Sequence, residues 1–391
     1  MNGSAIAEIF RNVLASDNAH SLAFSLHHRK VIDAITSCRT PALGGQVEHC
    51  DHCGHEIVRY HSCRDRHCPR CQTTARLSWV NDRLQELLPV GYFHAVFTVP
   101  HELNPFALRN KKCFYGLLFR AVKETILELA ANPKRLGADI GVVAVLHTWG
   151  QALTDHPHIH CIVTGGGYDQ ASKRWKPCQN AFLFPIPVIR KLFRGKLIDF
   201  FIQAVKTGDI TFTGSLADVA GERSFKELVN TLYVKEWTVY VKQPFASPEA
   251  LVKYLGAYTH RVAISDSRIV EHNPQFVSFA YKDYAHEGER KIMALSPHEF
   301  VRRFLLHVLP QGFKKIRYFG FLAPRARKKR LTQCRTFFKK KPVDLKKGSS
   351  PWHQIVKELT GRDPLRCPKC DSGTLRCVVT LAPFTALIPT G

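Results

Sequence analysis

Two closely spaced pairs of cysteines constrain the fold of this chain more than any other feature of the sequence. Cys50 and Cys53 form one C-x2-C pair, and Cys68 and Cys71 form a second pair in the same stretch. A C-x2-C turn brings two thiolates together, and two such turns complete the tetrahedral ligand set of a structural zinc ion. We therefore predict a zinc site made of Cys50, Cys53, Cys68 and Cys71, within a small module that the metal stabilises.

Further metal ligands crowd the same segment and leave the composition of the site open. Cys38 precedes the two pairs, and four more residues lie between or beside them: His55, His61, Cys63 and His67. Any of these side chains can replace one of the four cysteines, or can bind a second ion together with Cys38.

A third C-x2-C pair, Cys367 and Cys370, lies near the end of the chain without an evident partner pair. Cys334 and Cys377 are the candidates for completing a zinc site with it. A pair of free thiols is the alternative, because half of a ligand set does not by itself define a metal site.

The chain is strongly basic, with 56 Lys and Arg against 32 Asp and Glu and a net charge of +24. Residues 301–350 concentrate this charge, since Asp344 is their single acidic residue. Lysine and arginine neutralise phosphates, and aromatic side chains such as Phe337 stack on exposed bases, so the stretch predicts contact with nucleic acid. A solvated basic linker is the alternative. The predicted DNA-binding residues are Arg325, Arg327, Lys328, Lys329, Arg330, Lys339, Lys340 and Lys341.

Membrane and secreted proteins do not fit this sequence. No apolar stretch approaches the roughly 20 residues that a membrane-spanning helix needs. The first residues lack the basic and then apolar pattern of a secretory signal. Thirteen cysteines without such a signal indicate metal ligands and free thiols, which are typical of a cytoplasmic protein.

Strands and helices alternate irregularly along the chain, and several predicted strands are close enough for hairpins. Residues 141–150 and 158–164 are predicted strands joined by a turn near 154–157. Ser247 is the predicted N-cap of a helix over residues 247–258, and Ser296 begins another helix through His307. This order favours an α+β fold, with a central antiparallel sheet and flanking helices, over a doubly wound parallel sheet. We expect an N-terminal helix and zinc-binding module over 1–88, a catalytic domain over 89–295, and a basic C-terminal region with the third cysteine pair over 296–391.

Two histidines indicate a second kind of metal site. His158 and His160 point to the same face of a strand, because side chains alternate along it. Two neutral imidazoles provide half of a divalent metal site with open positions. If the turn closes a hairpin, Gln151 lies nearby, and its side-chain oxygen is the predicted third ligand, with Asp155 and His156 as alternatives. A pair of structural histidines is the simpler interpretation.

Two tyrosines share one face of a predicted helix over residues 247–258. Tyr254 and Tyr258 are four residues apart, so their side chains are neighbours on the helix surface. Packing in a hydrophobic core is the alternative interpretation. The flanking Lys253, His260 and Arg261 are an unusual setting for simple core packing.

Taken together, these motifs resemble a known family over most of the chain. His158 and His160 match the HUH motif, and Tyr254 and Tyr258 match the paired tyrosines of HUH endonucleases. With the zinc module that ends at Cys71, the sequence resembles the rolling-circle transposases of the insertion-sequence 91 family. The resemblance implies an HUH endonuclease-like palm in the catalytic domain and a bacterial, nucleoid-associated protein.

The resemblance also implies a mechanism and its participants. Tyr254 and Tyr258 would be the catalytic nucleophiles, and His158, His160 and a third ligand would bind Mg²⁺ or Mn²⁺. Cleavage of single-stranded DNA would leave a 5′-phosphotyrosine, and the partners would be single-stranded DNA, hairpin ends of the mobile element and target DNA. A replication initiator or relaxase with the same nicking chemistry, or a non-enzymatic zinc-finger DNA-binding protein, remains the alternative.

Overall fold

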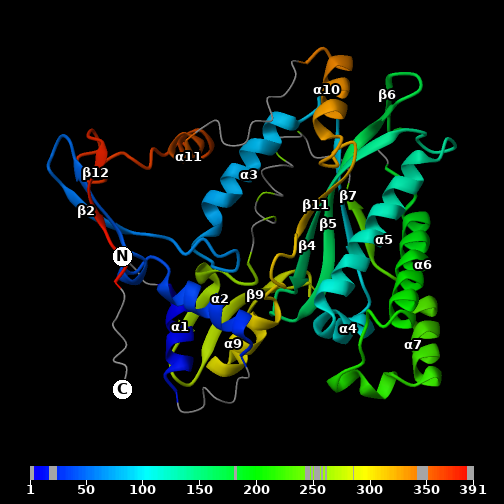
Figure 1. Cartoon of the computed structure of the whole chain (residues 1–391), viewed down its shortest axis with the longest axis horizontal. Helices are drawn as coiled ribbons and strands as arrows, with labels where there is room; N and C mark the ends of the chain where they lie inside the picture. Colours follow the sequence, from blue (N-terminus) through cyan, green and yellow to red (C-terminus); the bar gives the residue numbers. More distant parts are fainter. Residues whose placement is uncertain are drawn as a thin grey trace.

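The computed structural model describes most of the chain, and the description that follows is confined to those residues. They are residues 4–16, 24–179, 183–242, 247, 250, 256, 259, 262–284, 286–340 and 351–384. Within them the fold is α+β, with antiparallel sheets and helices packed against them, as the sequence predicts (Figure 1).

The central sheet has the strand order β11-β4-β5-β3-β7, and β6 pairs with β5 outside this path. Every pairing within it is antiparallel. The predicted hairpin is present, since β4 and β5 are joined by a short turn in which the Gly150 N–H donates to the Thr154 carbonyl at 2.8 Å. The strands are β3 (Tyr92–Thr98), β4 (Asp139–Trp149), β5 (Asp155–Asp169), β6 (Arg174–Pro177), β7 (Val239–Lys242) and β11 (Ile316–Gly320).

One face of this sheet supports the largest hydrophobic core. Ile159, Cys161 and Val163 alternate along β5 and are all completely buried on this face. Phe97 of β3 packs edge-on against Phe193, with ring centroids 5.1 Å apart. The helices on this side are α4 (Asn104–Arg109), α5 (Lys111–Ala131), α6 (Ile186–Lys206) and α7 (Glu222–Val234), and 3-10 turns flank them at η3 (His101–Leu103) and η5 (Gly214–Val219) (Figure 1).

The opposite face of the sheet is covered in part by α3 (Gln72–Glu86). Trp79 and Val80 of this helix pack on Tyr92, Val143 and Ile162, which occupy the alternate positions of the three middle strands. Helix α11 (Trp352–Thr360) packs on α3, and α10 (Arg327–Phe337) packs near β6 (Figure 1). The alternate positions of β5 therefore separate a hydrophobic face from a second face that includes its histidines.

A second lobe combines helices from both ends of the chain with a three-stranded sheet. Phe10 and Phe304 pack edge-on in its core, with ring centroids 5.1 Å apart. Ser4, Ser25 and Ser296 cap the helices, each accepting an N–H bond as capping serines do. The elements are α1 (Ala5–Leu14), α2 (Leu26–Ser37), η6 (Asp266–Arg268), β8 (Ile269–His272), β9 (Val277–Asp283), β10 (Glu289–Leu295) and α9 (Pro297–Leu306).

A third sheet joins the first and last parts of the chain. Its order is β12-β1-β2, so the C-terminal strand pairs with a strand of the N-terminal module (Figure 1). The strands are β1 (Gly45–Cys50), β2 (Glu56–Tyr60) and β12 (Leu375–Leu381), after a short turn at η2 (Pro41–Leu43). The predicted C-terminal region, residues 296–391, thus contributes α9 to the second lobe, β11 to the central sheet and β12 to the third sheet.

Among the described helices, none is both long and apolar enough to cross a membrane.

Gly320, at the end of β11, provides a test of the central sheet. Its φ is +62°, and an added Cβ atom would lie 1.6 Å from the Ile140 carbonyl oxygen. We expect Gly320→Ala to lower the free energy of unfolding by about 1–3 kcal/mol from backbone strain alone, and by more because of the clash. Gly116→Ala, on α5 with open space around it, is the control and should not destabilise the chain. Equal thermal unfolding midpoints for Gly320→Ala and wild type would contradict this placement of β11.

Candidate metal centres and active site

Three histidines converge on the second face of the central sheet. His147 of β4 joins His158 and His160 of β5, and one ring nitrogen from each lies within 4.8 Å of the others. The Nε2 atoms of His158 and His160 are 3.1 Å apart. Metal–nitrogen bonds of about 2.1 Å separate neighbouring ligands by about 3.0 Å in octahedral and about 3.4 Å in tetrahedral geometry. The spacing of His158 and His160 therefore suits two ligands of one divalent ion, and His147 lies close enough to be a candidate third ligand.

Strand register explains this convergence. His147 stands directly opposite His158, and Val145 stands opposite His160, in the antiparallel pairing of β4 and β5. Alternation along each strand then brings the three imidazoles to one face, while Ile159 enters the core on the other. The structure thus places His158 and His160 on a common face, as their spacing predicts.

Neighbouring groups orient two of the imidazoles. His158 Nδ1 is 2.6 Å from the His156 carbonyl oxygen, to which it donates, and this leaves Nε2 as a lone-pair donor. His160 Nδ1 lies 2.9 Å from Nε2 of the buried His94 on β3. Burial lowers the pKa of His158 to about 4, so its imidazole is neutral at pH 7 and able to bind a metal. His94 is a functional candidate that the sequence analysis missed.

The predicted third ligand, Gln151, lies in the turn beyond the paired part of β4. Its backbone carbonyl accepts a bond from Arg268 Nη2 at 2.5 Å. Of the two alternatives, Asp155 lines a separate cavity with Lys111 and Arg302, and His156 contributes its carbonyl to His158. Neither Asp155 nor His156 belongs to the histidine group, whereas His147 does, which makes His147 a candidate third ligand beside Gln151.

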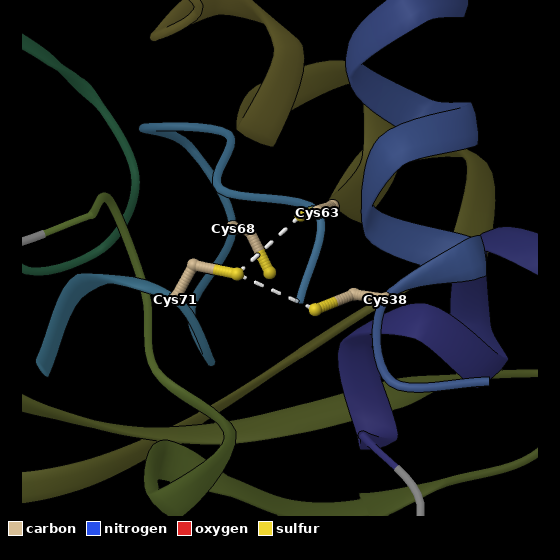
Figure 2. Close-up of side chains that lie close together, drawn as sticks. All are labelled: Cys38, Cys63, Cys68 and Cys71. Carbon is tan, nitrogen blue, oxygen red and sulfur yellow. Dashed lines mark hydrogen bonds between the residues drawn. The ribbon is translucent and has the colours of Figure 1, made fainter. Parts of the chain in front are cut away.

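Four cysteines form a separate cluster at the edge of the second lobe. Cys38, Cys63, Cys68 and Cys71 place their sulfur atoms within 4.8 Å of one another (Figure 2). Cys71 Sγ is 3.4 Å from Cys38 Sγ and 3.5 Å from Cys63 Sγ. These distances are far longer than a disulfide bond and near the edge of about 3.8 Å expected for a zinc–thiolate tetrahedron. The cluster therefore has the composition and shape of a closed structural zinc site.

The two cysteine pairs predicted to share one zinc site do not lie together in the structure. Cys68 and Cys71 belong to the cluster above, whereas Cys50 and Cys53 lie beside the C-terminal pair. The reason is the hairpin of β1 and β2, which carries the first pair at its tip and the second pair beyond its base. Cys38 and Cys63, two of the candidate ligands of a second ion, belong to this cluster, whereas the candidates His55, His61 and His67 do not.

Arg66 and His67, which lie beside this cluster in the sequence, connect it to the central sheet. His67 Nε2 accepts the Leu309 N–H at 3.1 Å, and Arg66 donates to the Pro310 carbonyl at 2.8 Å. The buried His307, two residues before Leu309, lies 3.2 Å from the Leu153 carbonyl in the turn between β4 and β5. The cysteine module is therefore bonded to the segment that supports the turn between β4 and β5.

The predicted DNA-binding residues divide into two groups. Arg327 forms an ion pair with the buried Glu86, and Arg330 forms one with Asp139, so these two guanidinium groups help to hold α10 in place. Lys341 lies outside the described residues. The exposed members, whose charges are available to phosphates, are Arg325, Lys328, Lys329, Lys339 and Lys340.

Tyr254 and Tyr258 also lie outside the described residues, but parts of their segment are described. The Ser247 side chain accepts the Ala250 N–H at 3.1 Å, which is the predicted helix cap. Gly256 is helical, and an added Cβ atom there would lie 2.2 Å from Val80 on α3. The described part of this segment therefore contacts the helix that covers the histidine face of the sheet.

Comparisons with known proteins agree on the kind of protein to which this chain is similar. Residues 9–99 match a family model described as a transposase zinc-binding domain of the IS91 type, and residues 141–330 match one described as "putative transposase". The "putative transposase y4qJ" of Sinorhizobium fredii is 45% identical over 376 residues, covering 96% of this chain and 94% of that protein. The transposase for insertion sequence element IS801 of Pseudomonas savastanoi pv. phaseolicola is 27% identical over 362 residues, covering 90% and 83%. No solved structure matches.

Substitutions of His147 and Gln151 show which of the two is the third metal ligand. We expect His147→Ala to weaken Mn²⁺ binding by at least about tenfold, because it removes one of three imidazole ligands. Gln151→Ala should leave the affinity unchanged. Titration calorimetry with the purified chain measures both constants, and the reverse order of effects would restore Gln151 as the third ligand.

Proposed function

Because this chain belongs to the insertion-sequence 91 family of transposases, we propose that it cuts one DNA strand and joins it elsewhere through a tyrosine linkage. It is a DNA-processing protein with a zinc-binding domain. The proposal extends this to rolling-circle transposition, with metal-dependent cleavage and transfer of single-stranded DNA. The observation that supports it most strongly is the convergence of His147, His158 and His160 on one face of the sheet.

The three imidazoles fit a divalent ion that leaves open positions for substrate. When bound, Mg²⁺ or Mn²⁺ would neutralise phosphate charge and polarise the phosphoryl oxygens. Magnesium prefers oxygen ligands, so a set of three nitrogens favours Mn²⁺ over Mg²⁺. His94 and the His156 carbonyl would act as positioning groups, because they bond the Nδ1 atoms of His160 and His158 and fix the direction of each Nε2.

Tyr254 and Tyr258 are the proposed nucleophiles. The phenol oxygen would form a bond to the scissile phosphorus while the bond from phosphorus to the 3′ oxygen breaks. The tyrosine loses its proton and the departing 3′ oxygen gains one, which leaves a 5′-phosphotyrosine and a free 3′-hydroxyl. The linkage preserves the energy of the phosphodiester, so that the strand can be rejoined without ATP. Two nucleophiles allow a donor strand and a target strand to be held in turn.

The packing of Gly256 supports this assignment. Gly256 lies between the two tyrosines in the sequence and contacts Val80, which itself packs among residues of the histidine face. The exposed basic residues of α10 and of the segment after it supply charge for the phosphates of single-stranded DNA, including hairpin ends of the element, and of the target.

The nucleophiles can be tested with a single-stranded oligonucleotide from the end of the element and Mn²⁺. We expect a covalent adduct between protein and DNA that survives denaturing electrophoresis. The double variant Tyr254→Phe/Tyr258→Phe should form none, because a phenyl ring lacks the attacking oxygen. Tyr233→Phe, at an exposed tyrosine on α7 on the other side of the sheet, is the matched control and should retain the adduct.

The outcomes separate the proposal from its rivals. An adduct that persists in the double variant would refute the nucleophile assignment. DNA binding without any adduct, and unaffected by loss of His158 and His160, would indicate a DNA-binding protein without nicking activity. Nicking without joining to a second DNA would indicate an initiator or relaxase.

The position of Gly256 gives an independent prediction. Gly256→Val adds atoms where Val80 already stands, so the tyrosine segment must move away from α3. We expect adduct formation to fall at least about tenfold, because small displacements of a nucleophile cost large factors in rate. Gly195→Val on α6, where space is open, is the control and should retain activity. Full activity of Gly256→Val would show that this contact does not position the tyrosines.

A further inference from the structure

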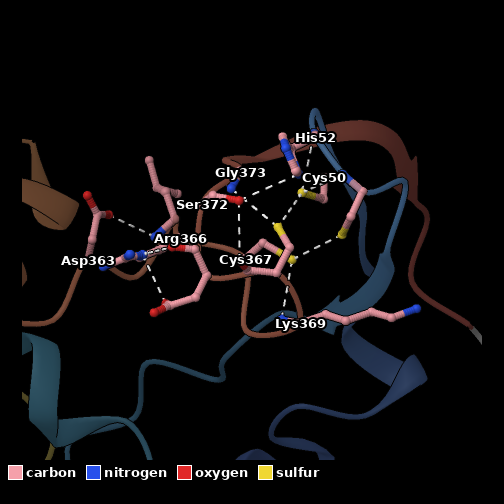
Figure 3. A network of polar contacts seen from close by, with 12 residues as sticks. Cys50, His52, Asp363, Arg366, Cys367, Lys369, Ser372 and Gly373 are labelled. Atoms are coloured by element: carbon pink, nitrogen blue, oxygen red, sulfur yellow. Dashed lines mark hydrogen bonds and ion pairs between the residues drawn. The ribbon is translucent and has the colours of Figure 1, made fainter.

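We propose that Cys50, Cys53, Cys367 and Cys370 bind a second structural zinc ion that fastens the C-terminal segment to the N-terminal module. Their sulfur atoms all lie within 4.8 Å of one another (Figure 3). Cys50 Sγ is 3.7 Å from Cys370 Sγ, and Cys53 Sγ is 3.8 Å from Cys367 Sγ. Zinc–sulfur bonds of about 2.3 Å give a tetrahedron with edges of about 3.8 Å, which matches both distances and excludes disulfides.

Both cysteine turns have the backbone arrangement that stabilises thiolate ligands. The Cys50 sulfur accepts backbone N–H groups of His52 and Cys53, each at 3.5 Å. The Cys367 sulfur accepts the N–H of Lys369 at 3.4 Å, as Figure 3 shows. Donors directed at sulfur favour its charged form, which is the form that binds zinc. The same arrangement on both turns indicates two halves of one site.

The residue after each turn has the same backbone conformation. Gly54 follows Cys53 with φ +69°, and Asp371 follows Cys370 with φ +55°. An aspartate with positive φ is strained, and this conformation persists only where the surrounding structure enforces it. The matched geometry lets each chain reverse direction immediately after its second ligand.

The turn at residues 50–53 and the segment at residues 373–374 pack closely against each other. An added Cβ atom on Gly373 would lie 2.4 Å from the Cys50 sulfur, so a residue without a side chain is required there. The Asp51 carboxylate accepts the Thr374 N–H at 2.7 Å, and the Asp51 N–H donates to the Thr374 carbonyl at 3.1 Å. The two turns are therefore bonded through backbone as well as brought together by their ligands.

This part of the molecule has almost no hydrophobic core of its own. Its buried cluster consists of Cys50, Cys367 and Leu375, with Ile57 and Cys370 packed against them. Val378 and Val379 of β12 are each about half exposed, at 55% and 51%. A unit this small needs a metal or disulfides to remain folded, and these cysteines are too far apart for disulfides. The metal is therefore the component that makes the pairing of β12 with β1 stable.

The other cysteines near the end of the chain are not part of the site. Cys334 is buried between α10 and the central sheet, and Cys377 is exposed on β12. Neither belongs to the group of four. Cys367 and Cys370 also lie beyond the two segments that match the family models, residues 9–99 and 141–330. Neither family model therefore covers all four cysteines of the second site.

The second ion also affects the helices that cover the histidine face of the central sheet. Residues 361–374 connect the metal site to α11, which packs on α3, and Leu359 of α11 packs with Trp79 and Val80. Fastening the C-terminal segment thus keeps α11 on the helix that covers the histidine face. Loss of the second ion should release β12 and α11 while leaving the first cysteine cluster intact.

The proposal can be tested by measuring the number of zinc ions per purified chain by inductively coupled plasma mass spectrometry. We expect Cys367→Ser/Cys370→Ser to contain one zinc ion fewer per chain than the wild type. Cys334→Ser/Cys377→Ser, the control, should match the wild type, and Cys38→Ser/Cys63→Ser should lose one ion but keep that of the second site. An equal zinc content in Cys367→Ser/Cys370→Ser and the wild type would overturn the proposal.

A measurement on the wild-type chain avoids dependence on variants that fail to fold. We expect Cys367 and Cys370 to resist alkylation until a chelator removes zinc, while the exposed Cys377 reacts at once. Hydrogen exchange should then increase in β12 after chelation, with little change in α6, which packs in the separate core of the central sheet. Rapid alkylation of Cys367 and Cys370 in the zinc-loaded chain would refute the site.

Discussion

The antiparallel pairing of β4 with β5 is the interaction on which the positions of the three histidines depend. Its register sets His147 opposite His158, and a shift of one residue would turn these side chains into the hydrophobic core. The core itself prevents such a shift, because Ile159, Cys161 and Val163 are completely buried against α5 and α6. Hydrophobic packing on one side of the sheet thereby fixes polar geometry on the other.

Local patterns predicted the elements that depend on neighbouring residues. The α+β class, the hairpin of β4 and β5, and the helix caps at Ser247 and Ser296 all follow from alternation or capping within a few positions. The shared face of His158 and His160 follows from the same alternation. The position of His147 required the register of the hairpin, which depends on where the turn begins, and the predicted turn lay too late in the sequence. His94 required the pairing of β3 with β5, which no local signal specifies.

The grouping of the cysteines also could not be predicted from local sequence patterns. Spacing identified three C-x2-C pairs, and each pair does lie within a group of four cysteines in the structure. Which turns share an ion depends on the course of the chain between them. The β1–β2 hairpin separates Cys50 and Cys53 from Cys68 and Cys71, and β12 returns from the far end of the sequence to meet them. Sequence spacing alone favoured the nearer partner.

The pairing of β12 with β1 has a consequence for how the protein is made. The N-terminal module emerges first from the ribosome, but its outer strand and half of its second ligand set arrive only with the last residues. Cys50 and Cys53 therefore lack the other two cysteines of their group until the intervening chain has been synthesised. A shorter product that lacks residues 367–381 could fold the central sheet but would lack both β12 and two of these four cysteines.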